Sequence, residues 1–224
     1  ILNARSAILM DADSGAILYA KNIHQQEYPA STTKILTTLI ASERCSMDEI
    51  VDFSYDAVHD IDPGSNHIAI DPGEQLTMEE MLYGLMLRSG NDAAVAIAEH
   101  IGGSVPQFVQ RMNARAAELG AANTHFANPN GLPDDTHVTT AYDLALIARA
   151  AMGNEAFRRI VSTRSAQIPW AGRTYSRQLR NKNRLLETYP GATGVKTGFT
   201  SRAGRCLVFG ASRDGMELVG VVLN

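Results

Sequence analysis

Strand-like patterns at both ends of the chain enclose a long helical middle, and this arrangement is the strongest constraint on the fold. The segment "SAILMDADSGAILYAKN" has two short apolar runs around a cluster of turn-forming residues, which predicts a β-hairpin. Four later segments also have the short apolar runs of strands: "RSAQIPW", "GVKTGFT", "RCLVFGAS" and "MELVGVVLN". A sheet assembled from both ends of the chain, around a helical insertion, buries these apolar faces most simply.

The middle of the chain follows the helical spacing of apolar residues. Thr77 and Glu80 have the pattern of a capping box at the start of "TMEEMLYGLML". Another helix is expected to begin at Ser31, where threonines alternate with apolar residues, so burial must stabilise it more than propensity does. We therefore expect an α/β fold of the α+β type. Its sheet subdomain would comprise about 1–54 and 161–224, and its helical subdomain about 55–160.

The composition excludes some classes of protein. The formal net charge is −4 and no run of Lys and Arg occurs, so we expect no nucleic-acid partner. No apolar stretch is long enough to span a bilayer. Cys45 and Cys206 are far apart, which favours unpaired thiols over a disulfide. The start at Ile1 fits a trimmed cytosolic protein or an exported one whose signal peptide was removed. The final strand ends at Asn224, and we expect the native chain to continue.

Lys34 occupies an unfavourable position near the start of the helix expected at Ser31. A cation there lies close to the positive end of the helix dipole and beside apolar residues. Ser31 precedes it by three residues, so the two side chains share one helix face. A serine hydroxyl needs a base, and a lysine acts as one only when burial or positive neighbours lower its pKa. The pair therefore predicts a nucleophile and its base, with free main-chain N–H groups for an oxyanion.

Taken alone, Ser-x-x-Lys also fits an N-cap serine followed by a lysine that extends to water. A second motif, Ser89-Gly90-Asn91, lies between two expected helices. It fits a simple turn with a helix cap. It also fits a second hydroxyl that relays a proton, next to an amide that orients a substrate carbonyl.

The third motif, Lys196-Thr197-Gly198, lies in an expected strand. It fits a solvated edge strand. It also fits a strand that pairs with an extended substrate, in which Lys196 and Thr197 hold a carboxylate and Gly198 permits close approach of the backbone. The N–H of Phe199 would then be the second oxyanion donor. Arg202 and Arg205 could help to hold the carboxylate, although surface ion pairing is favoured.

In this order, the three motifs match the Ser-x-x-Lys, Ser-x-Asn and Lys-Thr-Gly set of serine acyl-transfer enzymes. Over essentially its whole length, the chain resembles the low-molecular-mass penicillin-binding proteins, which are serine-type D-alanyl-D-alanine carboxypeptidases. The resemblance implies a β-lactamase/transpeptidase-like fold with a cleft between sheet and helices. It also implies a location in the cell envelope, outside the cytoplasmic membrane. Membrane binding would depend on the family's C-terminal anchor, which follows a C-terminal β domain; neither is in this sequence.

The resemblance further implies a reaction in peptidoglycan synthesis and cell-shape maintenance. Ser31 would attack a stem peptide that ends in D-Ala-D-Ala, and β-lactams would acylate the same serine. Lys34, Ser89 and Asn91 would be the other catalytic residues, and residues 196–199 would bind substrate. We expect no cofactor and no metal, because the six histidines lack a zinc-binding spacing.

Three alternatives remain open at this point. A class A β-lactamase would need a Glu-x-x-Leu-Asn pattern before "TTAYDLA", and this sequence lacks it. A penicillin sensor would be acylated once and would not turn over. A structural protein would retain the three motifs only as vestiges.

Overall fold

The strands form two antiparallel sheets in the computed structural model, which describes residues 2–224. The main sheet has five strands in the order β2-β1-β7-β6-β5, and β3 and β4 form a separate pair. The strands are β1 Ser6–Asp11, β2 Ile17–Lys21, β3 Ser165–Ile168, β4 Arg177–Arg180, β5 Ala192–Thr200, β6 Gly204–Arg213 and β7 Met216–Leu223. The main sheet therefore combines both ends of the chain, as predicted.

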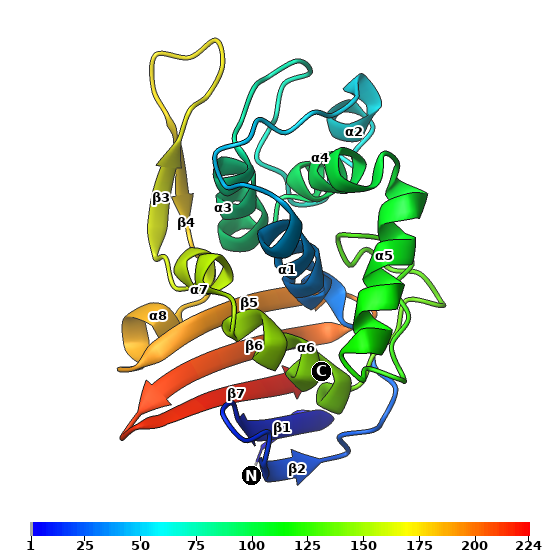
Figure 1. Cartoon of the computed structure of the whole chain (residues 1–224), viewed down its shortest axis with the longest axis vertical. Coiled ribbons are helices and arrows are strands. Elements are labelled where there is room, and N and C mark those ends of the chain that lie inside the picture. The colour runs from blue at the N-terminus through cyan, green and yellow to red at the C-terminus, as the bar shows by residue number, and fades with distance from the viewer. Residues whose placement is uncertain (1) are drawn as a thin grey trace.

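Along the chain the helices lie between the second and the fifth strand, and most of them lie above the main sheet in Figure 1. They are α1 Lys34–Arg44, α2 Tyr55–His59, α3 Met78–Arg88, α4 Asn91–Gly102, α5 Val105–Glu118, α6 Ala141–Met152, α7 Glu155–Val161 and α8 Leu185–Thr188. The capping box predicted at Thr77 and Glu80 is present at the start of α3. Within residues 2–224, no helix has both the length and the apolar character needed to cross a membrane.

Local sequence sets the turns of the main sheet. Between β6 and β7, Asp214 and Gly215 both have positive φ, at 52° and 77°. This is the backbone of a two-residue hairpin turn, for which Asp-Gly is a preferred sequence. The cluster "DADSG" likewise separates β1 from β2, which pair in antiparallel register. These hairpins confirm the predicted strands at both ends of the chain.

Alternation along the strands creates the face that supports the helices. Ile8 and Met10 on β1, Val208 on β6, and Val219 and Val221 on β7 are all buried. Side chains two apart share a face of a sheet, so these residues form one apolar layer. Helix α6 packs on β1 and β7 there, although it belongs to the segment 55–160. The boundaries of the two expected subdomains stay a prediction.

Helix α1 occupies the centre of the molecule and contacts α3, α4, α5, α6 and β5. Its expected start at Ser31 is wrong: a 3-10 turn, Ala30–Thr33, comes first, and the α-helix begins at Lys34. In a 3-10 turn, side chains at i and i+3 eclipse one another. The turn therefore places the side chains of Ser31 and Lys34 in line along one face.

The strand expected at 164–170 exists as β3, but it pairs only with β4, which the sequence analysis missed. Arg177 of β4 is responsible for this placement. Its buried guanidinium forms an ion pair with Glu74 at 2.6 Å and donates to the carbonyls of Ile68 and Ala69, both at 2.8 Å. These bonds hold the β3–β4 hairpin against the segment before α3, away from the main sheet.

Removing one partner of the Arg177–Glu74 pair should be strongly destabilising. Burial favours a raised pKa of Glu74, but bonds from Arg177 and from main-chain N–H groups keep that pKa below its ordinary value. In Arg177→Met the carboxylate stays buried without its partner. We expect the free energy of unfolding to fall by about 3–5 kcal/mol in urea denaturation.

Arg180→Met is the matched control, since Arg180 lies on the same strand as Arg177 but forms an exposed ion pair, with Glu187. Exposed pairs contribute about 0–1 kcal/mol. The double variant Glu74→Gln/Arg177→Met should lose less stability than Arg177→Met alone. Equal losses in the Arg177 and Arg180 variants would contradict this account.

Candidate active site

Ser31 and Lys34 are in direct contact. Lys34 is completely buried, and its Nζ lies 3.0 Å from Ser31 Oγ and 2.7 Å from the main-chain oxygen of Asn130. A carbonyl oxygen can only accept, so Lys34 must direct an N–H at Asn130. A neutral amine then has its lone pair free for the Ser31 hydroxyl. An ammonium would have three N–H donors for these two acceptors.

The surroundings of Lys34 favour the neutral amine. Burial lowers its pKa well below the ordinary value, and the positive charges of Lys196 and Lys182 lower it further. The carboxylate of Asp92 acts in the opposite direction. Desolvation and like charges both penalise the ammonium. Lys34 is therefore suited to accept a proton at neutral pH.

The loop before α6 holds this pair in place through main-chain groups. Thr37 Oγ1 donates to the carbonyl of Pro129 at 2.7 Å, next to the carbonyl of Asn130 that Lys34 uses. Gly131 has φ +94°, and a Cβ there would lie 1.9 Å from the oxygen of Ala30, so only glycine fits. These contacts explain why a threonine-rich helix is stable here. The sequence analysis missed Asn130, because its contribution comes from a carbonyl that every residue has.

His137 joins the same loop to the turn that carries Ser31. Its Nδ1 accepts the N–H of Ala127 at 2.8 Å, so its Nε2 carries the proton and donates to Thr33 Oγ1 at 2.7 Å. Burial lowers the pKa of His137 to about 4. The side chain is therefore a neutral bridge between the loop and the turn that carries Ser31.

Because the pKa of His137 is lower in the folded protein, the free energy of unfolding should fall as the pH falls from about 6.5 to about 4. The unfolded chain binds a proton at its ordinary pKa of 6.5 and the folded protein only near 4. The contribution of His137 is complete above about pH 6.5 and lost on the way to pH 4, by on the order of 3 kcal/mol. Denaturant titrations at pH 7 and pH 4 should show this loss in the wild type and in His125→Gln, an exposed control, but not in His137→Gln. An unchanged pH dependence in His137→Gln would contradict it.

The second motif lies at the junction of α3 and α4. Ser89 ends α3 in the left-handed conformation, with φ 61°, which few residues other than glycine adopt. Ser89 Oγ and Asn91 Oδ1 are both buried, and neither has a hydrogen-bond partner among the described residues. Buried polar groups are normally paired, and strained, unpaired ones concentrate at functional sites.

The third motif is on β5, the edge strand of the main sheet. Lys196 is buried, and its Nζ donates to the carbonyl of Thr197 at 2.8 Å. Burial, followed by the charge of Lys182, lowers the pKa of Lys196 to about 7. A Cβ on Gly198 would lie 2.9 Å from the main-chain nitrogen of Ser31, so this glycine lets β5 approach the serine closely.

A cleft of about 430 Å³ brings together residues of the first two motifs and Phe199, which follows the third. Ser31, Asn91, Asn130 and Phe199 line it. Thr197 and Gly198 line a neighbouring hollow of about 390 Å³, which shares Phe199 with the cleft. Ser89 and Lys196 are buried beside these walls and do not line either space.

Two residues near β5 have simpler roles. Arg202 lines the cleft and forms an ion pair with Asp135 at 2.7 Å, so the surface ion pairing favoured from the sequence is confirmed for Arg202. Arg205 forms no ion pair among the described residues. Cys206 is a buried free thiol, and burial raises its pKa to about 11. A thiol that stays protonated is a poor nucleophile, which supports packing as its role.

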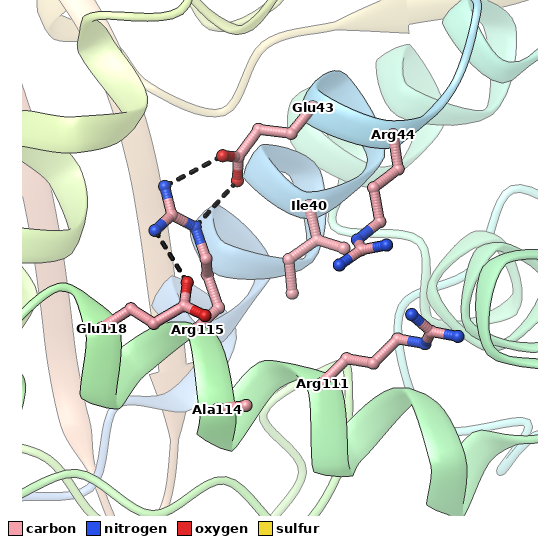
Figure 2. A pocket seen from close by; sticks show the side chains of 7 residues that line it. All are labelled: Ile40, Glu43, Arg44, Arg111, Ala114, Arg115 and Glu118. Atoms are coloured by element: carbon pink, nitrogen blue, oxygen red, sulfur yellow. Dashed lines mark hydrogen bonds and ion pairs between the residues drawn. The ribbon is translucent and has the colours of Figure 1, made fainter.

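A hollow of about 510 Å³ between α1 and α5 is larger but lacks comparable chemistry (Figure 2). Arg115 makes a two-pronged contact with Glu43 and pairs with Glu118, so both carboxylates of the hollow already have an ion-pair partner. Arg44 and Arg111 complete its charged lining. The residues that line this hollow include no hydroxyl, thiol or imidazole that could act as a nucleophile.

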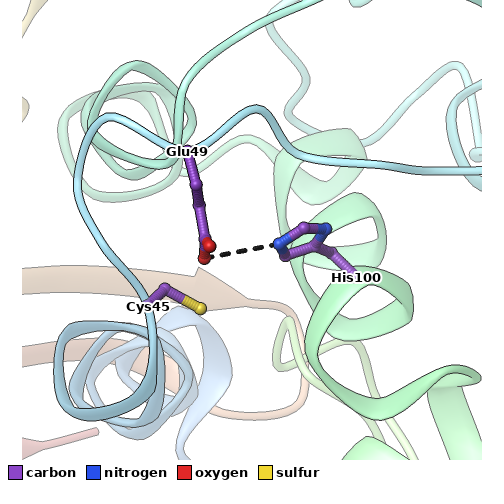
Figure 3. A group of neighbouring side chains, drawn as sticks. All are labelled: Cys45, Glu49 and His100. Carbon is purple, nitrogen blue, oxygen red and sulfur yellow. Dashed lines mark hydrogen bonds and ion pairs between the residues drawn. The ribbon is translucent and has the colours of Figure 1, made fainter.

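Cys45, Glu49 and His100 form a small cluster at the end of α1 (Figure 3). Burial raises the pKa of the Cys45 thiol to about 12. His100 Nδ1 accepts the N–H of Asp52 at 3.0 Å, so Nε2 carries the proton and points it at Glu49. Neither the thiol nor that nitrogen offers a free lone pair of the kind that a metal ligand needs.

The comparisons with known proteins agree with this geometry. The D-alanyl-D-alanine carboxypeptidase family matches residues 1–224. The chain is 40% identical over 223 residues to D-alanyl-D-alanine carboxypeptidase DacF of Bacillus subtilis, covering 99% of the chain and 57% of the relative. It is 38% identical over 218 residues to DacB2 of Mycobacterium tuberculosis, covering 96% and 73%.

Solved structures show the same fold. The crystal structure of a D-alanyl-D-alanine carboxypeptidase from Mycobacterium tuberculosis has a TM-score of 0.92 and 36% identity, covering 99% of this chain and 82% of that one. DacD from Francisella tularensis has a TM-score of 0.91 and 31% identity, covering 100% and 66%. The chain spans little more than half of the Bacillus relative. Its matched motifs and fold nevertheless place it in the D-alanyl-D-alanine carboxypeptidase family.

Proposed function

We propose that this chain is the catalytic part of a serine D-alanyl-D-alanine carboxypeptidase that acts on peptidoglycan stem peptides. The observation that carries the proposal is the 3.0 Å contact between Ser31 Oγ and the buried Nζ of Lys34. The relatives that match nearly the whole chain are named D-alanyl-D-alanine carboxypeptidases, which supports the same reaction. Such a substrate lies outside the cytoplasmic membrane, which implies an exported protein. An anchor beyond this chain stays a prediction.

Acylation begins when the neutral amine of Lys34 takes the proton of Ser31 Oγ. The oxygen then forms a bond to the carbonyl carbon of the penultimate D-alanine. The N–H groups of Ser31 and Phe199 stabilise the oxyanion. Ser89 relays a proton to the nitrogen of the terminal residue, the C–N bond breaks, and D-alanine leaves. Water then hydrolyses the ester and returns Ser31.

Binding groups fix the substrate for this attack. The Asn91 amide orients the peptide backbone, since its Oδ1 has no partner in the described protein. Lys196 and Thr197 hold the terminal carboxylate, and β5 pairs with the extended peptide as an edge strand does. With a pKa of about 7, Lys196 gains its full charge when a carboxylate binds beside it.

The class A β-lactamase alternative requires a glutamate before α6, and the segment 119–140 contains none. Its two aspartates have other partners: Asp134 binds Thr136, and Asp135 pairs with Arg202. Neither is therefore free to activate a water for rapid hydrolysis of the acyl-enzyme.

One experiment separates the enzyme from its alternatives. The protein is incubated with diacetyl-Lys-D-Ala-D-Ala while released D-alanine is measured, and a second sample with benzylpenicillin is digested for mass spectrometry. We expect repeated turnover of the peptide and a stable adduct on the Ser31 peptide. Fast penicillin hydrolysis would indicate a β-lactamase. A stable adduct without peptide turnover would indicate a sensor, and an adduct elsewhere would overturn the proposal.

A further inference from the structure

Lys182 lies outside the three motifs, in the segment between β4 and α8, and contacts a residue of the cleft wall. Its main-chain N–H donates to the carbonyl of Leu87 at 3.2 Å, just before Ser89. Its Nζ donates to Asn66 Oδ1 at 2.9 Å. Asn66 itself lines the cleft together with Ser31 and Asn91. Lys182 therefore connects a remote segment of the chain to the wall of the candidate active site.

Asn66 passes this connection on to Asn91. The main-chain oxygen of Asn66 accepts the N–H of Asn91 at 2.8 Å. Asn91 is the first residue of α4, and its N-cap, Gly90, has no side chain that could satisfy a free N–H at the helix start. The carbonyl of Asn66 fills that role. A residue that holds Asn66 in place therefore also holds the start of α4, which carries Asn91 and its unpaired Oδ1.

Lys182 also places a positive charge near two buried amines. Among the described residues it forms no ion pair with a carboxylate. Besides burial, the charges of Lys196 on β5 and of Lys182 lower the pKa of Lys34, and Asp92 on α4 raises it. Besides burial, the charge of Lys182 also lowers the pKa of Lys196. Burial, followed by the charge of Arg88 at the end of α3, lowers the pKa of Lys182 itself. Asp92 is the only negative group among these influences, and its carboxylate already accepts the N–H groups of Ile68 and Ile70.

We propose that Lys182 is a positioning residue for the candidate active site: its ammonium holds Asn66, and through it Asn91, and it stands as an uncompensated positive charge beside Lys34 and Lys196. The inference rests on the proposed function, because it assigns a purpose to the charge only if Lys34 is a base. It adds to that function a residue that no motif contains.

The sign of the effect follows from the charge. Removing a nearby positive charge makes protonation of Lys34 and Lys196 easier, so a smaller fraction of Lys34 is the free amine at a given pH. The acid limb of the acylation profile should move to higher pH, by on the order of one pH unit. Without the charge of Lys182, the acylation rate should be about tenfold lower at pH values below the acid limb and unchanged at high pH.

The test compares β-lactam acylation rates from pH 5 to pH 10 in three single variants and the wild type. Lys182→Gln removes the charge but retains an N–H donor for Asn66, and its limb should shift upward. Lys182→Arg retains both the charge and the donor, and its limb should stay in place. Lys21→Gln is the matched control, because it removes a positive charge on β2, at the opposite edge of the sheet from β5. Its profile should coincide with the wild type.

A fourth variant isolates the hydrogen bond. Asn66→Ala removes the acceptor of Lys182 but retains the main-chain oxygen that Asn91 uses, and the rate should fall by a similar factor at every pH. A uniform loss in Lys182→Gln, with no shift of the limb, would overturn the electrostatic role. A shifted limb in Lys182→Arg would do the same, and it remains informative if Lys182→Gln does not fold. If the wild type itself is never acylated at Ser31, the proposed function fails instead.

Discussion

Ser31→Ala is expected to abolish covalent labelling by benzylpenicillin and to reduce D-alanine release by at least about 10⁴-fold. Among the described residues, the variant loses the only oxygen within hydrogen-bonding distance of Lys34 Nζ that can form an ester. Removal of a nucleophile leaves only the rate that binding and oxyanion stabilisation provide. Intact-mass spectrometry after exposure to the antibiotic measures the adduct directly.

Ser42→Ala is the matched control for this variant. Ser42 is also a serine and lies on α1, the helix that begins at Lys34. Its Oγ donates to the carbonyl of Thr38. We expect its labelling to equal that of the wild type. A Ser31→Ala protein that still gains the mass of the antibiotic would remove Ser31 as the nucleophile.

Lys34→Arg and Lys34→Met are expected to lower the acylation rate by about 10³-fold or more. A guanidinium cannot give up its proton at these pH values, and a thioether is not a base for a hydroxyl. Stability should change less than activity. In Lys34→Met the carbonyl of Asn130 loses its donor, which costs about 1–3 kcal/mol, while the cost of burying an amine disappears.

The combination of results distinguishes a base from a structural lysine. Rates of acylation by a chromogenic cephalosporin and unfolding by urea should be measured on the same samples. A base gives a large loss of rate with a modest change in the free energy of unfolding. Near-normal acylation in Lys34→Arg, or a loss of rate that only follows unfolding, would exclude Lys34 as the base.

Turn chemistry and alternation made the main sheet predictable. Asp214 and Gly215 specify one hairpin, and the strands on either side alternate between buried and partly exposed residues. The β3–β4 pair could not be predicted in the same way. Its position depends on Arg177, a residue that a sequence pattern places on the surface and that the fold buries against Glu74. Long-range pairing of this kind leaves no local signal.

Some residues of the candidate site could likewise be predicted from the sequence, and others could not. Ser31, Lys34, Ser89, Asn91 and residues 196–199 could be named because their side chains form recognisable motifs. The roles of these residues remain proposals. Asn130 contributes a main-chain carbonyl, and such a group has no signature in a sequence. Lys182 resembles any solvated lysine in a loop until the fold places it beside Asn66.

The central claim is that Lys34 is a neutral amine near pH 7, because burial and two neighbouring lysines lower its pKa. NMR titration of the protein labelled with ¹³C and ¹⁵N at its lysine side chains tests this directly, with the Lys34 signal assigned from its absence in Lys34→Arg. We expect that signal to titrate far below the ordinary value of 10.5. A Lys34 signal that stays fully protonated up to pH 10 would contradict the account.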